Sequence, residues 1–307
     1  QYDEKIHGEK LRKEIDLSHL DGTTRDLVYK LLQKYWSVFD DKGQFVPVKD
    51  YKCSIDTGSA RPICVRNINY GPGETPIMRK CIASLEKLHG GGWMFKALLA
   101  PKPHQEQVKN IDDFVWRFCI NYIPLNQVTR PVAYPIPRCD SAVHLTFCDG
   151  RWMWMWDAPQ GYHQIGVERE SQEKLAFAGP DAMKWTYNVM PFGPVNGPAT
   201  FIAFIHDVDS TWKDLARSLG ITINEDTNTN IIVDDILSWA KSLMIALVYM
   251  ECQLRVCQSQ NLSLSLRKSH IFPKRFEFVG IDVGPNGNRP AMSKHQLLEH
   301  WPTPVIV

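Results

Sequence analysis

The sequence predicts an α+β fold, in which an antiparallel sheet is backed by helices. Two patterns favour this class. Between residues 24 and 39, apolar residues recur at spacings of three and four, the period of an amphipathic helix. Residues 228 to 240, NTNIIVDDILSWA, instead form two short apolar runs around adjacent aspartates, the pattern of a β-hairpin. With 307 residues, 44% of them hydrophobic, the chain can form one large domain or two lobes.

The other elements follow the same two periods. Further helices are expected at residues 76–88, 198–219 and 242–258. Two apolar segments, FKALLA and FVWRFCINYI, flank a polar connector and predict a pair of strands between residues 93 and 123. Residues 151–157, RWMWMWD, predict a strand that ends in an acid, and FEFVGIDV at 276–283 predicts one more strand.

Composition excludes several classes of protein. No apolar run reaches 18 residues and the N-terminus lacks the pattern of a signal peptide, so we expect no membrane partner and a location in cytoplasm or nucleus. Eight cysteines without a C-x-x-C pair indicate reduced thiols. The net charge is +1, but Arg61 to Arg138 holds eleven basic and five acidic residues. Such a basic segment suits phosphate binding and equally suits an ordinary surface.

Three acids are the candidates for chemistry: Asp157 at the end of one apolar strand, and Asp234 with Asp235 between two others. Clustered carboxylates repel one another unless divalent cations neutralise them. Two Mg²⁺ ions held by such a cluster suit phosphoryl transfer. The alternative is that the adjacent pair forms an exposed turn, where Asp is common.

Six blocks in order resemble the reverse transcriptases of gypsy-type LTR retrotransposons, within a Pol polyprotein. The blocks are WRFCINYIPLNQVT (116–129), YPIPR (134–138), DAPQGYHQI (157–165), MPFGPVNGPATF (190–201), IVDD (232–235), and RKSHIF (267–272) with FEFVGIDV. The resemblance implies an RNA-directed DNA polymerase with a right-hand fold. It implies two-metal nucleotidyl transfer from dNTPs to a primer on an RNA or DNA template. The cofactor is two Mg²⁺ ions, with Mn²⁺ as a substitute.

The resemblance also implies a role for each matching residue. Asp157, Asp234 and Asp235 match the metal-binding catalytic acids, and Lys268 matches a lysine beside the leaving pyrophosphate. The residues matching nucleotide contacts are Arg117 and Lys109 (or Lys102) for the triphosphate, Tyr162 under the sugar, and Phe192 with Gly193 over the nucleotide and template. A planar guanidinium suits phosphate oxygens.

The same resemblance sets the expected domain layout. Residues 1–60 form an N-terminal extension with the helix at 24–39, residues 61–150 form fingers to which 165–190 return, and residues 151–284 form the palm. Residues 285–307 begin a truncated thumb, so the thumb and RNase H regions of the parent polyprotein are expected to be missing.

Two alternatives stay open. Ile232 stands where the family has tyrosine, which favours a catalytically inactive scaffold that binds RNA or protein. Asp56-Thr57-Gly58 matches an aspartic-protease signature, although apolar strands do not flank it. His163 has no second histidine at ligand spacing, so we expect a structural role for it.

Overall fold

The structure is a computed structural model that describes residues 4–39, 46–65, 69–101, 115–135, 152–180, 183–232, 235–278, 281–283 and 289–290. The chain divides into two compact units. Unit 1 comprises Gln1–Val46, Pro135–Gly161 and Ile202–Val307, and unit 2 comprises Pro47–Tyr134 and Tyr162–Phe201. This division rests on contacts alone, and the assignment of fingers, palm and thumb remains a prediction.

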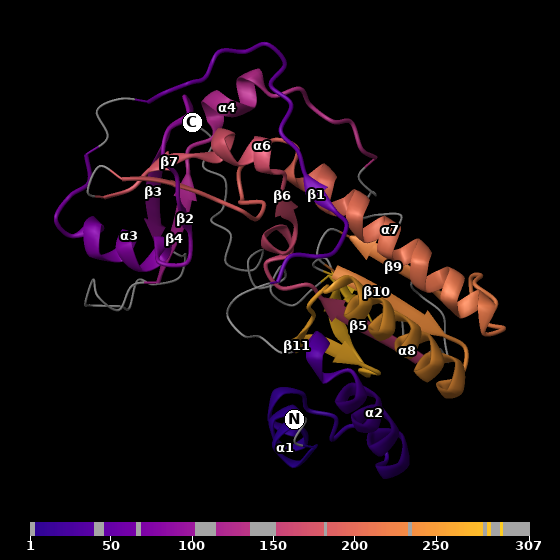
Figure 1. Cartoon of the computed structure of the whole chain (residues 1–307). Coiled ribbons are helices and arrows are strands. Elements are labelled where there is room, and N and C mark those ends of the chain that lie inside the picture. Colours follow the sequence, from indigo (N-terminus) through magenta and orange to yellow (C-terminus); the bar gives the residue numbers. More distant parts are fainter. Residues whose placement is uncertain are drawn as a thin grey trace, which may run out of the picture. The chain divides into compact units, whose positions relative to one another are not determined.

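Unit 1 is built on a four-stranded antiparallel sheet in the order β11-β5-β10-β9 (Figure 1). The strands are β5 (Trp152–Asp157), β9 (Asn228–Ile232), β10 (Asp235–Ala240) and β11 (Ser265–Ile271). The sequence-based prediction of a hairpin at 228–240 is therefore confirmed. Alternate residues of β5 face opposite sides of the sheet, and Trp154 and Trp156 are fully buried on one of them.

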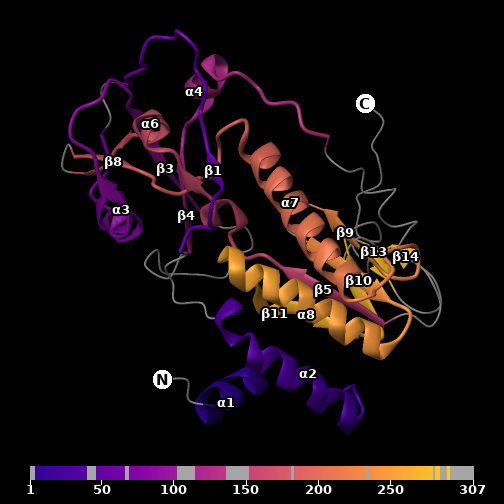
Figure 2. The ribbon, with the colours of Figure 1, turned by 45° about the vertical axis from the view of Figure 1, so that its right-hand side comes forward.

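Helix α8 (Leu243–Gln260) covers this tryptophan face by packing on β5 and β10 (Figure 2). The Ser242 side chain caps its first turn, and Asn261 ends it in the left-handed conformation with φ 59°. On its other side α8 contacts α2 (Gly22–Lys34), which pairs with α1 (Glu4–Glu14). The helix predicted at 24–39 thus ends at Lys34 and is followed by a 3₁₀ turn, Trp36–Val38.

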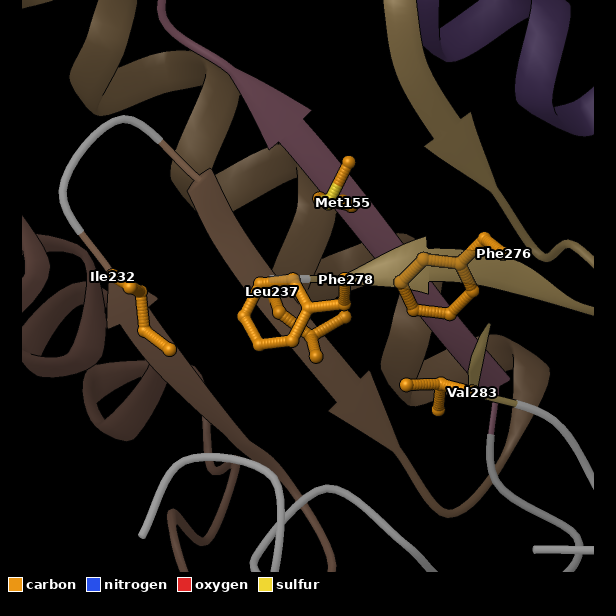
Figure 3. Close-up of a cluster of buried hydrophobic side chains, with 6 residues drawn as sticks. All are labelled: Met155, Ile232, Leu237, Phe276, Phe278 and Val283. Atoms are coloured by element: carbon orange, nitrogen blue, oxygen red, sulfur yellow. The ribbon is translucent and has the colours of Figure 1, made fainter. Parts of the chain in front are cut away.

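The opposite face of the sheet carries an apolar cluster, shown in Figure 3. It joins sheet residues to a small antiparallel sheet, β12 (Phe276–Phe278), β13 (Ile281–Val283) and β14 (Arg289–Pro290). The prediction of a single strand at 276–283 is wrong. Phe276–Phe278 pairs antiparallel with Ile281–Val283, so the segment forms two strands, and residues 279–280 lie outside the described residues.

Unit 2 contains a five-stranded sheet in the order β2-β8-β7-β3-β4. The strands are β2 (Glu86–Lys87), β3 (Phe95–Pro101), β4 (Trp116–Ile120), β7 (Phe177–Ala178) and β8 (Lys184–Thr186). β3 pairs antiparallel with β4, which confirms the two strands predicted between residues 93 and 123. A separate two-stranded sheet pairs β1 (Lys52–Cys53) with β6 (Gly166–Val167) in parallel.

The short helices of unit 2 are α3 (Glu74–Ile82), α4 (Ile123–Val128) and α6 (Arg169–Gln172), with 3₁₀ turns at Gly161–Gln164 and Glu173–Leu175. The helix predicted at 76–88 was too long. Glu86 and Lys87 pair with Thr186 and Trp185, so strand pairing overrides their helical propensity.

Helix α7 (Gly197–Ser218) runs from the end of unit 2 into unit 1, close to the predicted 198–219. Among the described helices, none is long and apolar enough to cross a membrane. The six described cysteines are free thiols, and Cys53, Cys252 and Cys257 are buried.

Candidate active site

Two of the predicted catalytic acids face each other in unit 1. Asp157 is the last residue of β5 and Asp235 is the first residue of β10, and the two are direct partners in the antiparallel register. Side chains of directly opposed residues project from the same face, with Cβ atoms about 4.5–5.5 Å apart. The fold therefore brings together two carboxylates 78 positions apart, Asp157 and Asp235. The third acid, Asp234, lies outside the described residues.

The Asp157 carboxylate lacks a partner for one oxygen. Its Oδ2 atom is buried and accepts no hydrogen bond from any described residue, and its side chain is only 15% exposed. An unpaired buried carboxylate oxygen is costly, because it has lost water without gaining a donor. A divalent cation bound by oxygen ligands is a partner of the right charge and hardness. The donor set at this strand end therefore fits a divalent cation.

No group of three or more histidine, cysteine, aspartate or glutamate side chains gathers anywhere in the described ranges. The described structure thus supplies two candidate ligands, Asp157 and Asp235, and a third ligand would have to come from Asp234 or from a substrate.

Lys268 is placed beside Asp157, with its Nζ atom 3.5 Å from Oδ1. The register of β11 against β5 shifts between Ser265 and His270, and such a bulge redirects the side chains within it. Ser269 lies in the same bulge, and its Oγ accepts a 3.4 Å hydrogen bond from the Asp157 backbone N–H. Sequence reasoning found Lys268 but missed Ser269, since a register shift leaves no signal in periodicity.

Ile232, the residue in place of the expected tyrosine, is buried next to Asp235 on the same face of the sheet. It is the register partner of Asp235 and packs in the apolar cluster with Met155 and Leu237 (Figure 3). The other members of the cluster are Phe276, Phe278 and Val283. Ile232 thus places an apolar side chain beside the acids, where the expected tyrosine would supply a hydroxyl group.

Two of the predicted nucleotide contacts, Tyr162 and Phe192, lie in one aromatic cluster in unit 2. The Tyr162 ring lies 5.0 Å from the Phe192 ring and 5.7 Å from the Phe201 ring, centroid to centroid. Phe192 is 55% exposed, so this aromatic cluster keeps an open face.

The backbone conformation and the close packing at position 193, directly after Phe192, require a glycine. Its φ is +113°, and a Cβ atom there would lie 3.1 Å from the Tyr122 ring. Asn126 holds the loop by donating to the Gly193 carbonyl and accepting from the Val195 N–H, at 2.9 Å each. The conformation of this loop is therefore fixed at several points.

The predicted triphosphate contacts are only partly described. Arg117 lies on β4 opposite Ala100, and its side chain is exposed while Ile120 on the same strand is buried. Lys109 and its alternative Lys102 lie outside the described residues. Arg117 is thus free to meet a ligand from solvent, and the structure leaves the lysine assignment as a prediction.

The protease alternative finds no support at Asp56. Its Oδ1 accepts from the Gly58 N–H at 2.8 Å, and its Oδ2 pairs with Arg130 at 3.1 Å. The Gly58 N–H, followed by Arg130, holds the pKa of Asp56 below its usual value. An aspartic-protease dyad instead needs a carboxylate that shares a proton. Asp56 therefore stabilises its own turn.

His163 packs between aromatic rings, 6.1 Å from Tyr187 and 5.3 Å from Phe192. Burial lowers the pKa of His163. These contacts support the structural role expected for it.

Comparison with known proteins places the fold among the polymerases. The chain is similar to the foamy viral protease–reverse transcriptase in complex with an RNA/DNA hybrid, with a TM-score of 0.77 and 17% identity over 98% of this chain and 38% of that one. A second structure, the foamy viral enzyme in complex with dsDNA, gives a TM-score of 0.78 and covers 49% of that chain. At this identity the likeness establishes the polymerase fold, in agreement with the predicted α+β class.

The family follows from the sequence match. Residues 109–283 match the profile of the reverse transcriptase (RNA-dependent DNA polymerase) family. The chain belongs to the reverse transcriptase family.

Its relatives are polyproteins of transposons and plant viruses. The chain is 30% identical over 190 residues to the retrovirus-related Pol polyprotein of transposon 297 from Drosophila melanogaster, covering 62% of this chain and 16% of the polyprotein. It is 25% identical over 185 residues to the enzymatic polyprotein of cauliflower mosaic virus (strain Strasbourg), covering 60% and 24%. The chain thus spans a quarter or less of these relatives. The predicted resemblance to a transposon Pol reverse transcriptase is confirmed.

Proposed function

We propose that this chain is an RNA-directed DNA polymerase that transfers nucleotides from dNTPs to a primer 3′-hydroxyl. The observation that carries the proposal is the register pairing of Asp157 with Asp235, with a buried Asp157 oxygen that lacks a hydrogen-bond donor. The family match and the polymerase fold support it.

Asp157, Asp234 and Asp235 would hold two Mg²⁺ ions, or Mn²⁺ in their place. Such ions, when bound, lower the pKa of a coordinated hydroxyl and neutralise charge on the transferred phosphoryl group. The role of the carboxylates is to hold the cations in position and to balance their positive charge. The apolar cluster that contains Ile232 lies beside the carboxylates on the same face of the sheet and excludes water from that side of the site.

Lys268 is proposed as the proton carrier toward the leaving pyrophosphate. Its exposed Nζ atom lies 3.5 Å from Asp157 Oδ1, next to a carboxylate that would hold the cations. An ion pair with this exposure adds little to folding stability. Its placement by the β11 bulge therefore supports a chemical role more than a structural one.

For the nucleotide, we propose Arg117 and Lys109 as triphosphate contacts, Tyr162 as the residue that excludes a 2′-hydroxyl, and Phe192 with Gly193 as contacts to base and template. The open face of Phe192 and the fixed Gly193 loop support the last assignment. The proposed partners are an RNA or DNA template with primer, and the proposed location is cytoplasm or nucleus.

One observation favours a second function, an inactive scaffold that binds RNA or protein. Ile232 removes a polar group from the site and is committed to the apolar cluster. The retained acids, Asp157 and Asp235, argue against this alternative.

Primer extension on poly(rA)/oligo(dT) with dTTP separates the two functions. The polymerase extends the primer with Mg²⁺ and stops when EDTA removes the metal. A scaffold binds the duplex in both conditions and extends it in neither, and that result would overturn the proposal.

A further inference from the structure

A glutamine with no solvent exposure lies in the middle of the apolar helix α8 of unit 1. The amide of Gln253 makes four hydrogen bonds. Its Oε1 accepts from the indole N–H groups of Trp154 and Trp156, at 2.8 Å each. Its Nε2 donates to Ser238 Oγ at 2.8 Å and to Thr229 Oγ1 at 3.1 Å. An indole N–H only donates, so the amide oxygen must face the tryptophans and every polar atom of Gln253 is satisfied.

These partners come from three adjacent strands. Trp154 of β5 pairs with Ser238 of β10, and Ser238 pairs with Thr229 of β9. The three residues form a row across the sheet, and Trp156 stands next to Trp154 on the same face. Tyr249, one turn before Gln253, extends the network through a 2.9 Å hydrogen bond to Thr229 Oγ1. Gln253 therefore ties β5, β10 and β9 to α8 and to one another.

The network disfavours a one-residue slip of β5. A slip of one residue would turn Trp154 and Trp156 to the other face. The amide of Gln253 would then be buried without partners, which is costly. The same slip would carry Asp157 away from the face it shares with Asp235. The hydrogen bonds on the α8 face thus protect the arrangement of carboxylates on the opposite face.

We propose that Gln253 is a positioning residue for the catalytic carboxylates. By fixing β5 against β10, it keeps Asp157 opposite Asp235 and so sets the affinity of this pair for divalent cations. The inference rests on the proposed function and extends it to a residue that touches neither cation nor substrate. A positioning role differs from ordinary core packing in one measurable respect. Loss of the Gln253 amide should weaken metal binding, whereas loss of a residue that only packs should lower stability and leave metal binding unchanged.

The test measures the dissociation constant of Mn²⁺ for the full chain. Electron paramagnetic resonance detects the free Mn²⁺ during the titration, and Gln253→Met is the main variant. Methionine keeps the length and helical propensity of glutamine and removes all four hydrogen bonds. We expect Mn²⁺ binding to weaken about tenfold, the lower end of the range for residues that orient metal ligands. The matched control is Val256→Ala, which trims a buried apolar side chain three residues further along the same helix. It should lower the melting temperature and leave the Mn²⁺ dissociation constant unchanged.

Ser238→Ala is the milder variant, since it removes one partner and keeps the amide. If Gln253→Met does not fold, Ser238→Ala decides: weaker Mn²⁺ binding supports the inference and an unchanged dissociation constant overturns it. Where both variants fold, an effect of Gln253→Met no larger than that of Val256→Ala would overturn it too. Failure of the unsubstituted chain to bind Mn²⁺ would instead refute the proposed function, and the inference with it.

Discussion

At the scale of single residues, position on the strand decides which side chains can act together. Asp157 and Asp235 share a face because they are register partners, and Ile232 shares it because it pairs with Asp235. The tryptophans of β5 fall on the other face, where α8 covers them. The alternation along β5 therefore puts the acid and the tryptophans on opposite faces of the sheet.

Replacement of Tyr162 by alanine tests its role in sugar selection. The Tyr162 ring is held against Phe192 and Phe201, so the proposed clash with a 2′-hydroxyl has a fixed geometry. Tyr162→Ala should raise the incorporation of rNTPs relative to dNTPs by about tenfold, a difference of about 1.4 kcal/mol. Primer extension with matched rNTP and dNTP concentrations measures the ratio. An unchanged ratio in a folded, active variant would remove Tyr162 from the site.

At the scale of elements, the small β12–β13–β14 sheet is coupled to the catalytic strands through side chains. Phe276 and Phe278 bring their rings to Met155 of β5 and Leu237 of β10 (Figure 3). The cluster therefore joins two separate sheets, β11-β5-β10-β9 and β12-β13-β14.

Truncation of Phe278 tests this coupling. Phe278 has no exposure, so Phe278→Ala should lower the free energy of unfolding by about 3–5 kcal/mol. Urea denaturation monitored by circular dichroism measures the loss. Phe118→Ala in unit 2 is a suitable comparison, because that ring is half-buried and contacts a single described ring, Phe177. Equal losses in the two variants would contradict the importance given to the cluster.

Periodicity predicted the long elements well. α7, α8, β5, β9 and β10 lie within two residues of their expected bounds, because each is rich in apolar residues over its whole length. One error falls where pairing between distant segments decides, because β2 pairs with β8 in place of the end of a predicted helix. The other error is local, because β12 pairs with β13 within the segment predicted as one strand. The acids of the candidate site were predicted from motifs. Gln253 was not, because its tryptophan partners are 97 and 99 positions away and its neighbours on α8 are apolar.

At the scale of the whole molecule, two histidines, one in each unit, couple stability to pH: His163 is half-buried and His270 is more exposed. Burial lowers the pKa of His163 and of His270 below 6.5. An unfolded chain then binds protons that the folded chain does not, so stability rises with pH in this window. The contribution is complete above pH 6.5 and is lost as pH falls toward the lowered values.

The melting temperature should therefore decrease when the pH is lowered from about 7.5 to about 5.5. His163→Gln removes one titrating group while keeping a polar side chain of similar size, so its melting temperature should fall less over the same range. Differential scanning calorimetry at both values provides the comparison. An equal decrease of the melting temperature in the unsubstituted chain and in His163→Gln would show that His163 does not contribute to the pH dependence of stability.

Charge distribution predicts the salt dependence of nucleic-acid binding. The net charge is +1, but the segment from Arg61 to Arg138 has an excess of six basic residues (eleven minus five). We expect affinity for a primer–template duplex to fall by about tenfold or more between about 50 and 200 mM salt, as phosphate contacts release counterions. Arg117→Ala should reduce the log–log slope by about one if Arg117 contacts phosphate. Fluorescence anisotropy measures both, and salt-insensitive binding would contradict the assignment.

The central claim is that the carboxylates at the ends of β5 and β10 hold the cations for nucleotide transfer. The most direct measurement compares primer extension by the unsubstituted chain, by Asp157→Asn and by Asp207→Asn, a control that removes an exposed acid of α7. Asp157→Asn should reduce extension by about a hundredfold or more, since losing a cation forfeits several kcal/mol of charge stabilisation in the transition state. Its melting temperature should not fall, because the Asp157 Oδ2 atom makes no hydrogen bond to any described residue. Asp207→Asn should extend primers normally. If Asp157→Asn keeps about half of the activity, the assignment of the site is wrong.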